Sequence, residues 1–355
     1  MKTMYYVNEN LPELYRIFES GTRHGFVRMD LNENPIGLPE SFVRKVFDSI
    51  PAQAISMYPE QGPLLECLAA FLGVEQNQLC LTNGSSEAVR YAIEAFTRPG
   101  GKYISVTPSF AMYAVFGQMY GRQHIPLGYN EDLTFDVDSI IEAIRPDVDL
   151  IFICNPNNPV GDVYTEEDMA RIIQAAKANE VTVVIDEAYH YFYPKTFLHF
   201  ALENDHVFVL RTFSKMFSLA GCRLGFIVGK AQGVNLIQKL CSPYNVNTLS
   251  LYFAKAILDE PGMLDSLIAA QREGKAYLVA ELTKRGYAFS AKEGNFLFIQ
   301  PKTDADLLVE RMKTEKKILI KAYRGIGALG KCLRVSTGQK EVMETFLQAM
   351  DELVR

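Results

Sequence analysis

The segment DLIFICNPNNPVGDVYTEEDMARIIQAAKANEVTVVIDE, residues 149–187, is the most informative stretch for the fold class of this chain. It opens with a predicted buried strand at 149–154, apolar from residue 150 onward, and passes through a turn rich in Asn and Pro into a helical stretch at 166–179. A second apolar run at 181–185 then ends at Asp186. Two almost entirely apolar strands joined by a helix are typical of parallel strands that are buried on both faces.

The same alternation extends on both sides of this segment. Short apolar runs that we interpret as strands lie at 79–82, 102–106, 124–127, 207–210 and 223–228, and helical stretches lie at 62–73 and 87–96. Apolar runs of this length, separated by helices, predict an α/β fold with a mainly parallel sheet covered on both faces.

The last third of the chain has a different pattern. A helix-rich stretch at 248–282 precedes expected strands at 294–299, 318–322 and 332–336 and expected helices at 304–316 and 339–354. This order is typical of a smaller α+β module. We therefore predict a large domain at 40–245 and a small domain made of 1–39 and 246–355.

Composition excludes several classes of function. The 36 Lys and Arg residues are outnumbered by 42 Asp and Glu, which gives a net charge of -6 and disfavours a dedicated nucleic-acid binder. We find neither an apolar run of about 18 residues nor an apolar signal segment, so we expect no membrane span. The six cysteines are scattered, with no cluster at zinc-ligand spacing, and indicate a reduced, cytoplasmic protein without a metal site.

Polar side chains gather where the predicted strands end. Ligands of open α/β sheets bind beyond the carboxyl ends of the strands. The residues at these ends are Ser85, Ser86, Phe110, Asn158, Asp186, Ser214 and Lys215. Their coincidence predicts a binding site at this edge of the sheet.

Each of these residues has a structural and a chemical interpretation. Lys215 is either a solvated surface group or, with its pKa lowered by burial, an amine nucleophile. Asp186 is either half of a buried ion pair with Lys215 or the partner of a protonated ring nitrogen of a cofactor. Asn158 lies in a sequence that forms turns in any protein, and its amide can also bind a ligand oxygen.

The remaining candidates are equally ambiguous when taken singly. Ser85 and Ser86 open a helix, as capping residues do, and a helix start is also an anion site. Arg223 is suited to a surface ion pair or to a bidentate contact with a phosphate. Phe110 is suited to a hydrophobic core or to stacking on a planar ligand.

Taken together, the motifs are far more specific. They are Asn-Gly-Ser-Ser-Glu at 83–87, Asn-Pro-Asn-Asn-Pro-Val-Gly at 155–161, Asp-Glu-Ala-Tyr at 186–189, Ser-Lys at 214–215, Arg223 and Leu-Arg-Val-Ser at 333–336. In this order the chain resembles the class I/II aminotransferases of fold type I, which depend on pyridoxal 5'-phosphate, and within them the histidinol-phosphate aminotransferases. The resemblance covers nearly the whole chain from Asp30 onward. It implies a seven-stranded-type sheet in the large domain, which would bind the cofactor.

The resemblance also assigns roles to individual residues. Lys215 would hold the cofactor as an internal aldimine and then move the substrate proton, with Asp186 and Tyr189 as the other catalytic groups. Asp186 would keep the ring nitrogen protonated. The other expected cofactor contacts are Tyr189 and Asn158 at the ring hydroxyl, Phe110 stacked on the ring, and Ser85, Ser86, Thr212, Ser214 and Arg223 at the phosphate.

Residues outside this set are expected to bind the substrate or a second subunit. Arg334 would bind the substrate carboxylate or its equivalent, with Asn34 and Lys321 nearby. Tyr58 resembles the tyrosine that reaches the phosphate of a partner subunit, which implies a homodimer with shared sites. Lys321 stands in the strand where histidinol-phosphate enzymes commonly have an arginine, so the amino donor stays open.

Three functions are compatible with these residues. The first is amino transfer from an amino acid or amino-alcohol phosphate, similar to histidinol phosphate, to a 2-oxo acid such as 2-oxoglutarate. The second is decarboxylation of a phosphorylated amino acid of the threonine-phosphate type. The third is a non-catalytic module that only binds pyridoxal phosphate. We expect small-molecule partners, and neither a nucleic acid nor a membrane.

Overall fold

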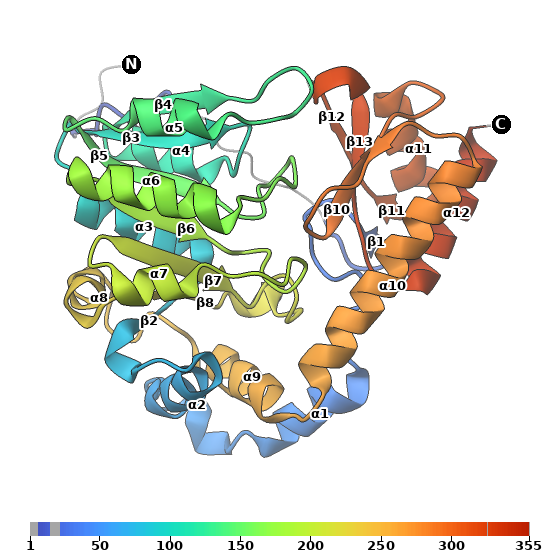
Figure 1. Ribbon diagram of the computed structural model, residues 1–355. Coiled ribbons are helices and arrows are strands. Elements are labelled where there is room, and N and C mark those ends of the chain that lie inside the picture. The colour runs from blue at the N-terminus through green and yellow to red at the C-terminus, as the bar shows by residue number, and fades with distance from the viewer. Residues whose placement is uncertain (1–5, 15–21, 325, 355) are drawn as a thin grey trace.

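The computed structural model describes residues 6–14, 22–324 and 326–354, and its centre is a seven-stranded sheet (Figure 1). Its strands are β2 (Leu79–Thr82), β3 (Lys102–Thr107), β4 (Gln123–Gly128), β5 (Val148–Cys154), β6 (Thr182–Asp186), β7 (Val207–Thr212) and β8 (Gly225–Val228). They lie in the order β2-β8-β7-β6-β5-β3-β4, and β8 alone runs in the direction opposite to the other six strands. The prediction of a mainly parallel α/β sheet is confirmed.

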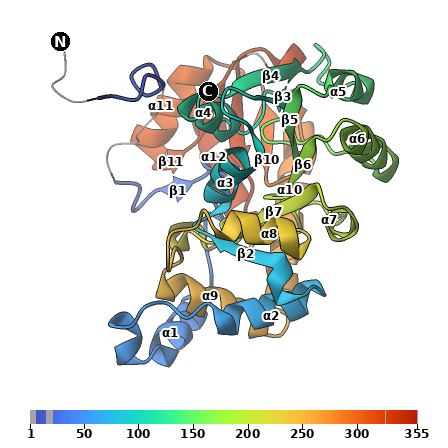
Figure 2. The ribbon, with the colours of Figure 1, turned by 90° about the vertical axis from the view of Figure 1, so that its left-hand side faces the viewer.

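Both faces of the sheet are buried, and the alternation along β5 shows how. Ile151 and Ile153 pack in the core under helices α1 (Glu40–Ser49), α2 (Gly62–Leu72), α5 (Val137–Ala143), α6 (Glu166–Ala178), α7 (Leu198–Glu203) and α9 (Thr248–Asp259). Leu150 and Phe152 point to the opposite core, under α3 (Ser85–Phe96), α4 (Met112–Met119) and α8 (Ala231–Gln238). Figure 2 shows α5, α6 and α7 together on one side of the strands. Successive side chains from Leu150 to Cys154 therefore pack alternately into the two cores, which is why this part of β5 is continuously apolar.

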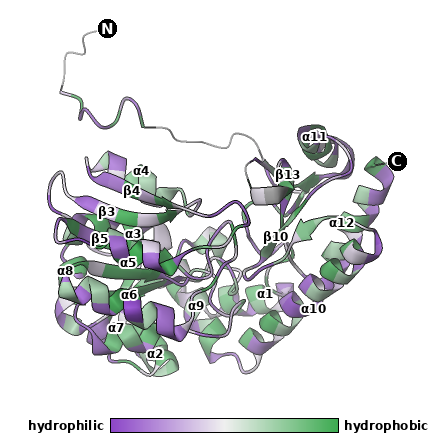
Figure 3. Ribbon diagram, turned by 45° about the horizontal axis from the view of Figure 1, so that its top comes forward, coloured by the Kyte–Doolittle hydropathy of each residue, from purple (hydrophilic) through white to green (hydrophobic). Residues whose placement is uncertain are grey.

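Local sequence explains where the helices begin. Thr165 caps α6: its hydroxyl accepts a hydrogen bond from the Asp168 amide at 3.0 Å, and Asp168 bonds back. Three acidic residues in the first turn complement the helix dipole. Figure 3 shows purple and green residues side by side on the covering helices, as expected of helices with one buried face.

The second module is built on a four-stranded antiparallel sheet of order β12-β13-β10-β9. Its strands are β9 (Phe289–Ser290), β10 (Phe296–Ile299), β12 (Lys321–Tyr323) and β13 (Cys332–Ser336), and it is packed against α10 (Met263–Lys284), α11 (Ala305–Lys316) and α12 (Lys340–Leu353). A separate parallel pair, β1 (Val27–Arg28) and β11 (Ile318–Leu319), brings the N-terminal segment to this module.

The single strand predicted at 318–322 is wrong. The chain breaks at Ile320, because β11 pairs with β1 whereas β12 pairs with β13. Ile320 itself is buried, so the apolar pattern continues through the point where the chain passes from one sheet to the other.

Other predicted boundaries shift by one to two residues. The strand expected at 223–228 begins at Gly225, because Ala220–Cys222 forms a 3-10 turn and Arg223 adopts a left-handed conformation with φ of 55°. The helix expected from residue 87 begins at Ser85. Further 3-10 turns lie at Ala52–Ile55, Gln76–Gln78 and Gly327–Leu329.

The long helix α10 runs from the region of α1 and α9 to the small module (Figure 1). The expected boundaries at 39/40 and 245/246 stay a prediction. Within the described ranges, we find no helix with both the length and the apolar content that a membrane crossing requires.

Candidate active site

A cavity of about 470 Å³ opens at the carboxyl ends of the parallel strands. The predicted residues that line it are Ser85, Ser86, Phe110, Asn158, Asp186, Tyr189, Thr212, Ser214, Lys215, Arg223 and Arg334. They come from the ends of β6 and β7, from the segments after β3, β5, β6 and β7, from the start of α3, from the turn before β8 and from β13 of the small module. Residues spread over 250 positions of sequence thus face one space.

Asp186 is buried at the end of β6, with 2% of its surface exposed. The Tyr113 hydroxyl donates to Oδ2 at 2.6 Å, and the Ala188 amide donates to Oδ1 at 3.0 Å. Burial raises the pKa of Asp186 to about 6, although both hydrogen bonds oppose that rise. The carboxyl group is therefore held in one orientation and is mostly ionised at neutral pH.

Lys215 follows β7 and directs its amine into the same cavity. Nζ donates to the Leu31 carbonyl at 2.8 Å and lies 5.8 Å from the centre of the Tyr189 ring. Burial, reinforced by the positive charges of Arg334 and Arg223, lowers the pKa of Lys215 to about 8. A substantial fraction of this amine is neutral near pH 8, which is the form that attacks a carbonyl.

The Tyr189 hydroxyl is held by Asn32. Asn32 Nδ2 donates to the Tyr189 oxygen at 2.8 Å, while Asn32 Oδ1 accepts from the Ser336 hydroxyl at 3.1 Å. This second bond fixes the orientation of the amide, so that its NH₂ group faces Tyr189. The tyrosine oxygen acts as acceptor, and its own proton can be donated to a ligand oxygen.

Arg334 lies across the cavity on β13 and links the two modules. Its Nη2 donates to the Asp30 carbonyl at 2.6 Å, and its Nη1 donates to Asn158 Oδ1 at 3.3 Å. The guanidinium also lies 4.9 Å from the centre of the Tyr323 ring. Its Nε is buried without a protein hydrogen-bond acceptor. Because the Oδ1 atom of Asn158 accepts this hydrogen bond, its NH₂ group can donate a hydrogen bond to another acceptor.

One end of the cavity is an anion cradle, formed by Ser85, Ser86, Thr212, Ser214 and Arg223. Arg223 Nη1 donates to the Ser214 hydroxyl at 3.2 Å, and Thr212 bonds the same hydroxyl at 2.9 Å. Ser85 and Ser86 are the first two residues of α3, whose backbone N–H groups start the helix and attract an anion.

Two glycines permit this close packing. Gly84 precedes α3 with φ of 79°, and an added Cβ there would lie 2.5 Å from Arg223 Nη2. A Cβ on Gly225 would lie 2.6 Å from the Ser85 amide nitrogen. Side chains at either position would displace the arginine or the helix start.

Three predicted residues lie outside the lining of this cavity. Asn34 is buried and donates to the Ser218 hydroxyl at 2.7 Å. Lys321 stands opposite Arg334 in the register of β12 and β13. Tyr58 is 74% exposed and stacks on Tyr244, with ring centres 4.4 Å apart. Their roles in binding stay predictions.

Sequence reasoning missed several residues of the site, among them Asn32 and Tyr113, which bond Tyr189 and Asp186. Asn32 was passed over for Asn34, two positions along the same motif, because the sequence does not reveal which asparagine points inward. Tyr113 lies in the first turn of α4, three residues after Phe110, and their rings are in edge contact with centres 5.7 Å apart; this short spacing could have drawn attention to it. Its partner Asp186 is 73 residues away, so only the folded chain shows their contact.

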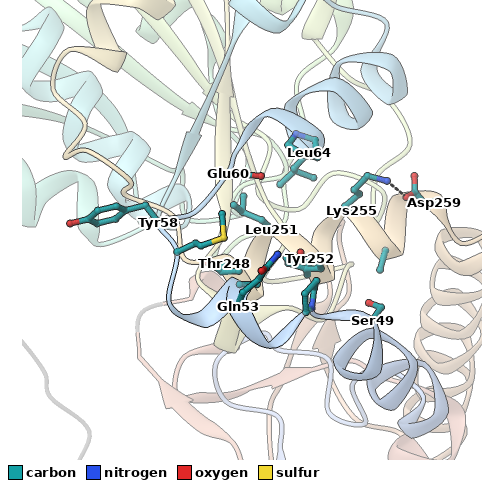
Figure 4. Close-up of a pocket in the computed structure, with 15 residues that line it drawn as sticks. Ser49, Gln53, Tyr58, Glu60, Leu64, Thr248, Leu251, Tyr252, Lys255 and Asp259 are labelled. Atoms are coloured by element: carbon teal, nitrogen blue, oxygen red, sulfur yellow. Dashed lines mark hydrogen bonds and ion pairs between the residues drawn. The ribbon is translucent and has the colours of Figure 1, made fainter.

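A second cavity, of about 370 Å³, lies between the segment from α1 to α2 and helix α9 (Figure 4). Tyr58 and Leu251 line it, and Figure 4 shows the ion pair of Lys255 with Asp259 at its edge. Around it, Phe47, Ile55, Met57, Tyr58 and Tyr244 are exposed apolar side chains. We call these five residues the apolar face.

The chain matches the profile of a known family and the sequences of named relatives. The sequence profile of the family aminotransferase class I and II matches residues 26–350. A histidinol-phosphate aminotransferase of Thermoanaerobacter pseudethanolicus is 34% identical over 331 residues, which is 92% of this chain and 93% of that protein. Histidinol-phosphate aminotransferase 2 of Burkholderia pseudomallei is 33% identical over 92% of both chains.

Solved structures share the fold. The histidinol-phosphate aminotransferase of Sinorhizobium meliloti, in complex with pyridoxal-5'-phosphate, superposes with a TM-score of 0.83 at 21% identity, over 93% of this chain and 91% of that one. L-threonine-O-3-phosphate decarboxylase of Porphyromonas gingivalis gives a TM-score of 0.77 at 23% identity, over 92% and 99%. The fold alone therefore does not separate amino transfer from decarboxylation.

Proposed function

The chain belongs to the class I and II aminotransferase family, and on that premise we propose that it binds pyridoxal 5'-phosphate in the cavity around Lys215. The enzyme is an aminotransferase. We propose further that its donor is an amino acid or amino-alcohol phosphate of the histidinol-phosphate type, and that its acceptor is a 2-oxo acid such as 2-oxoglutarate. The observation that carries this proposal is the convergence of Lys215, Asp186 and the anion cradle on one cavity.

The residues fit the three polar ends of this cofactor. The anion cradle, with a guanidinium, four hydroxyls and a helix start, suits a phosphate. Glycine at position 84 lets the Arg223 guanidinium lie against the turn before α3, since a Cβ there would displace it. Asp186 suits a protonated ring nitrogen, and the Lys215 amine suits an aldehyde.

When bound, pyridoxal phosphate withdraws electrons from the α-carbon of an attached amino acid. Asp186 favours this by holding a proton on the ring nitrogen, because Tyr113 and the Ala188 amide keep its carboxylate oriented. The Tyr189 hydroxyl and the Asn158 amide can both donate to an oxygen on the ring, since Asn32 and Arg334 occupy their acceptor atoms.

Lys215 is suited both to bind an aldehyde and to move a proton. With its pKa lowered to about 8, the amine exchanges a proton near neutral pH. Its hydrogen-bond acceptor is the Leu31 carbonyl, a neutral group that the amine can exchange for another partner.

The substrate anion is expected at Arg334. Lys321 lies directly opposite it across two antiparallel strands, so both side chains belong to the same face of the sheet. Two cations on one face favour a donor with an anionic group distant from its amine. The histidinol-phosphate names of the relatives support the same class of donor.

We also propose that the enzyme is a homodimer that associates through the apolar face. An exposed group of Phe47, Ile55, Met57, Tyr58 and Tyr244 is typical of a surface that a protein partner covers. Light scattering of the purified protein should give about twice the 40.0 kDa chain mass. A monomeric mass at micromolar concentration would contradict the dimer. A cytoplasmic location stays a prediction that rests on the scattered cysteines.

An amino-donor screen tests the function. Purified enzyme is loaded with pyridoxal phosphate and supplied with 2-oxoglutarate and one donor at a time, including histidinol phosphate and common amino acids. Formation of glutamate with ping-pong kinetics supports amino transfer. Release of carbon dioxide from threonine phosphate without glutamate would select the decarboxylase instead. Turnover of none of these compounds, with the cofactor bound, would favour the binding module.

A further inference from the structure

Two thiols approach each other where β2, the strand that leads into the anion cradle, meets the segment after α8. Cys80 is on β2 and 3% exposed, Cys241 follows α8 and is half-buried, and their Sγ atoms are 3.6 Å apart. They are 161 residues apart in sequence, so only the tertiary structure brings them together.

Hydrogen bonds on both sides hold this contact in place. Gln238 Nε2 donates to the Leu79 carbonyl at 3.1 Å, and Asn245 Nδ2 donates to the Leu81 carbonyl at 3.0 Å. These bonds flank Cys80 on β2 and Cys241 on the facing segment. The sulfurs need to approach by about 1.5 Å to reach the disulfide bond length.

We propose that Cys80 and Cys241 are a redox-active pair that a peroxide converts reversibly into a disulfide. The inference is independent of the proposed function. The Cys241 sulfur attacks one peroxide oxygen, the O–O bond breaks, and water leaves as Cys241 becomes a sulfenic acid. The Cys80 sulfur then attacks the Cys241 sulfur, the S–O bond breaks, and a second water leaves. The two thiols lose two electrons, and the peroxide gains them.

The two thiols are not equivalent, and Cys241 is the better nucleophile. The hydrogen bond from Cys80, together with a contact from Tyr91, lowers the pKa of Cys241. The same bond and burial hold the pKa of Cys80 well above its usual range. Cys241 is also the more exposed thiol, which gives a small oxidant access to it.

A disulfide bond between Cys80 and Cys241 would restrain β2, the strand that leads into Ser85 and Ser86 of the anion cradle. Asn245 also bonds Glu87 in the first turn of α3 at 3.3 Å, and Glu87 accepts from the Asn83 amide at 2.6 Å. A covalent tie between β2 and the segment after α8 therefore acts on the turn that leads into Ser85. It closes a long loop, so we expect a higher thermal midpoint.

Peptide mapping of the cofactor-loaded protein tests the pair. After treatment with hydrogen peroxide, we expect the loss of two of the six thiols, a mass lower by about 2 Da and a peptide that links residues 80 and 241. Dithiothreitol should restore both thiols. The thermal midpoint of the oxidised form should rise by at least about 2 °C.

Variants separate this pair from general oxidation. Cys241→Ser should abolish the linked peptide and the thermal shift, whereas Cys67→Ser, which removes another half-buried thiol, should leave both unchanged. Sulfinic acid at Cys241 without a link, links to other cysteines only, or six intact thiols in the wild type would each overturn the proposal. Mapping of the wild type decides the matter even if a variant does not fold.

Discussion

The two cavities of this molecule have similar volumes and very different linings. The first, about 470 Å³, places Lys215 and Asp186 at the ends of parallel strands and shifts their pKa values toward neutrality. The second, about 370 Å³, has an ordinary ion pair of Lys255 with Asp259 at its edge, and both side chains are about half exposed. Cavity size therefore says little about chemistry here. The chemical site is marked instead by buried ionisable groups whose pKa values are shifted in opposite directions.

The largest effect is expected when the amine of the first cavity is removed. We expect Lys215→Ala to lower turnover on the order of 10⁴-fold, because both the amine nucleophile and the proton carrier are lost. Steady-state assay of glutamate formation measures the loss, and circular dichroism checks folding. Lys230→Ala, which removes an exposed partner of Asp205, is the matched control. Full turnover by Lys215→Ala would refute the mechanism.

A pH profile tests whether the amine of Lys215 is perturbed. Only the neutral amine captures an aldehyde, so capture should rise with pH and level off above about 8. At pH 7.5 the neutral fraction should be roughly 200-fold larger than for a lysine with the ordinary pKa of 10.5. Stopped-flow absorbance of pyridoxal phosphate uptake by the ligand-free protein gives the profile.

A second variant tests the cause of the lowered Lys215 pKa. In Arg334→Gln a neighbouring positive charge is gone, so the Lys215 pKa rises and the midpoint of capture moves to higher pH. A profile that still climbs steeply at pH 9.5 in the wild type would show that the cavity leaves the lysine unperturbed.

The carboxylate of the first cavity should matter less than its amine. Asp186→Asn keeps the shape but loses the charge that holds a proton on the ring nitrogen, and we expect about 100-fold lower turnover. Asp162→Asn removes a carboxylate that pairs with Lys292 at 2.7 Å outside the cavity, and it serves as control. Equal losses in the two variants would mean that the effect of Asp186 is on folding.

The two asparagines of the N-terminal motif should differ. Asn32→Ala removes one hydrogen bond to Tyr189, and we expect about fivefold lower turnover, corresponding to about 1 kcal/mol. Asn34→Ala breaks the bond to Ser218 and should lower the thermal midpoint more than turnover. Turnover and thermal midpoint are measured for both variants. A larger loss of turnover in Asn34→Ala than in Asn32→Ala would identify Asn34 as the residue of the site.

The smallest effect is expected in the second cavity. Lys255→Ala should leave turnover within about twofold of the wild type, because an exposed ion pair contributes little. The same kinetic assay checks it, with Asp259→Asn as a companion variant. A tenfold loss would show that this cavity takes part in the reaction.

Strand patterns and turn motifs predicted most of the fold, because parallel strands buried on both faces must be apolar along their whole length. The prediction was wrong at Ile320, where apolarity continues while the chain changes sheets. Arg223 shows a different limit: its left-handed backbone excludes it from β8, and a non-glycine sequence does not signal that conformation.

The order of motifs along the chain was enough to determine the family and the set of polar groups at the strand ends, since each motif is local and its residues are adjacent. The tertiary structure alone decided which groups meet. It placed Asn32 rather than Asn34 against Tyr189, set Tyr113 on Asp186, and brought Cys80 to Cys241. Such contacts depend on the path of the backbone between distant segments, and on which face of an element each side chain occupies. Burial then shifts the pKa of Lys215 and Asp186, which no local pattern of residues contains.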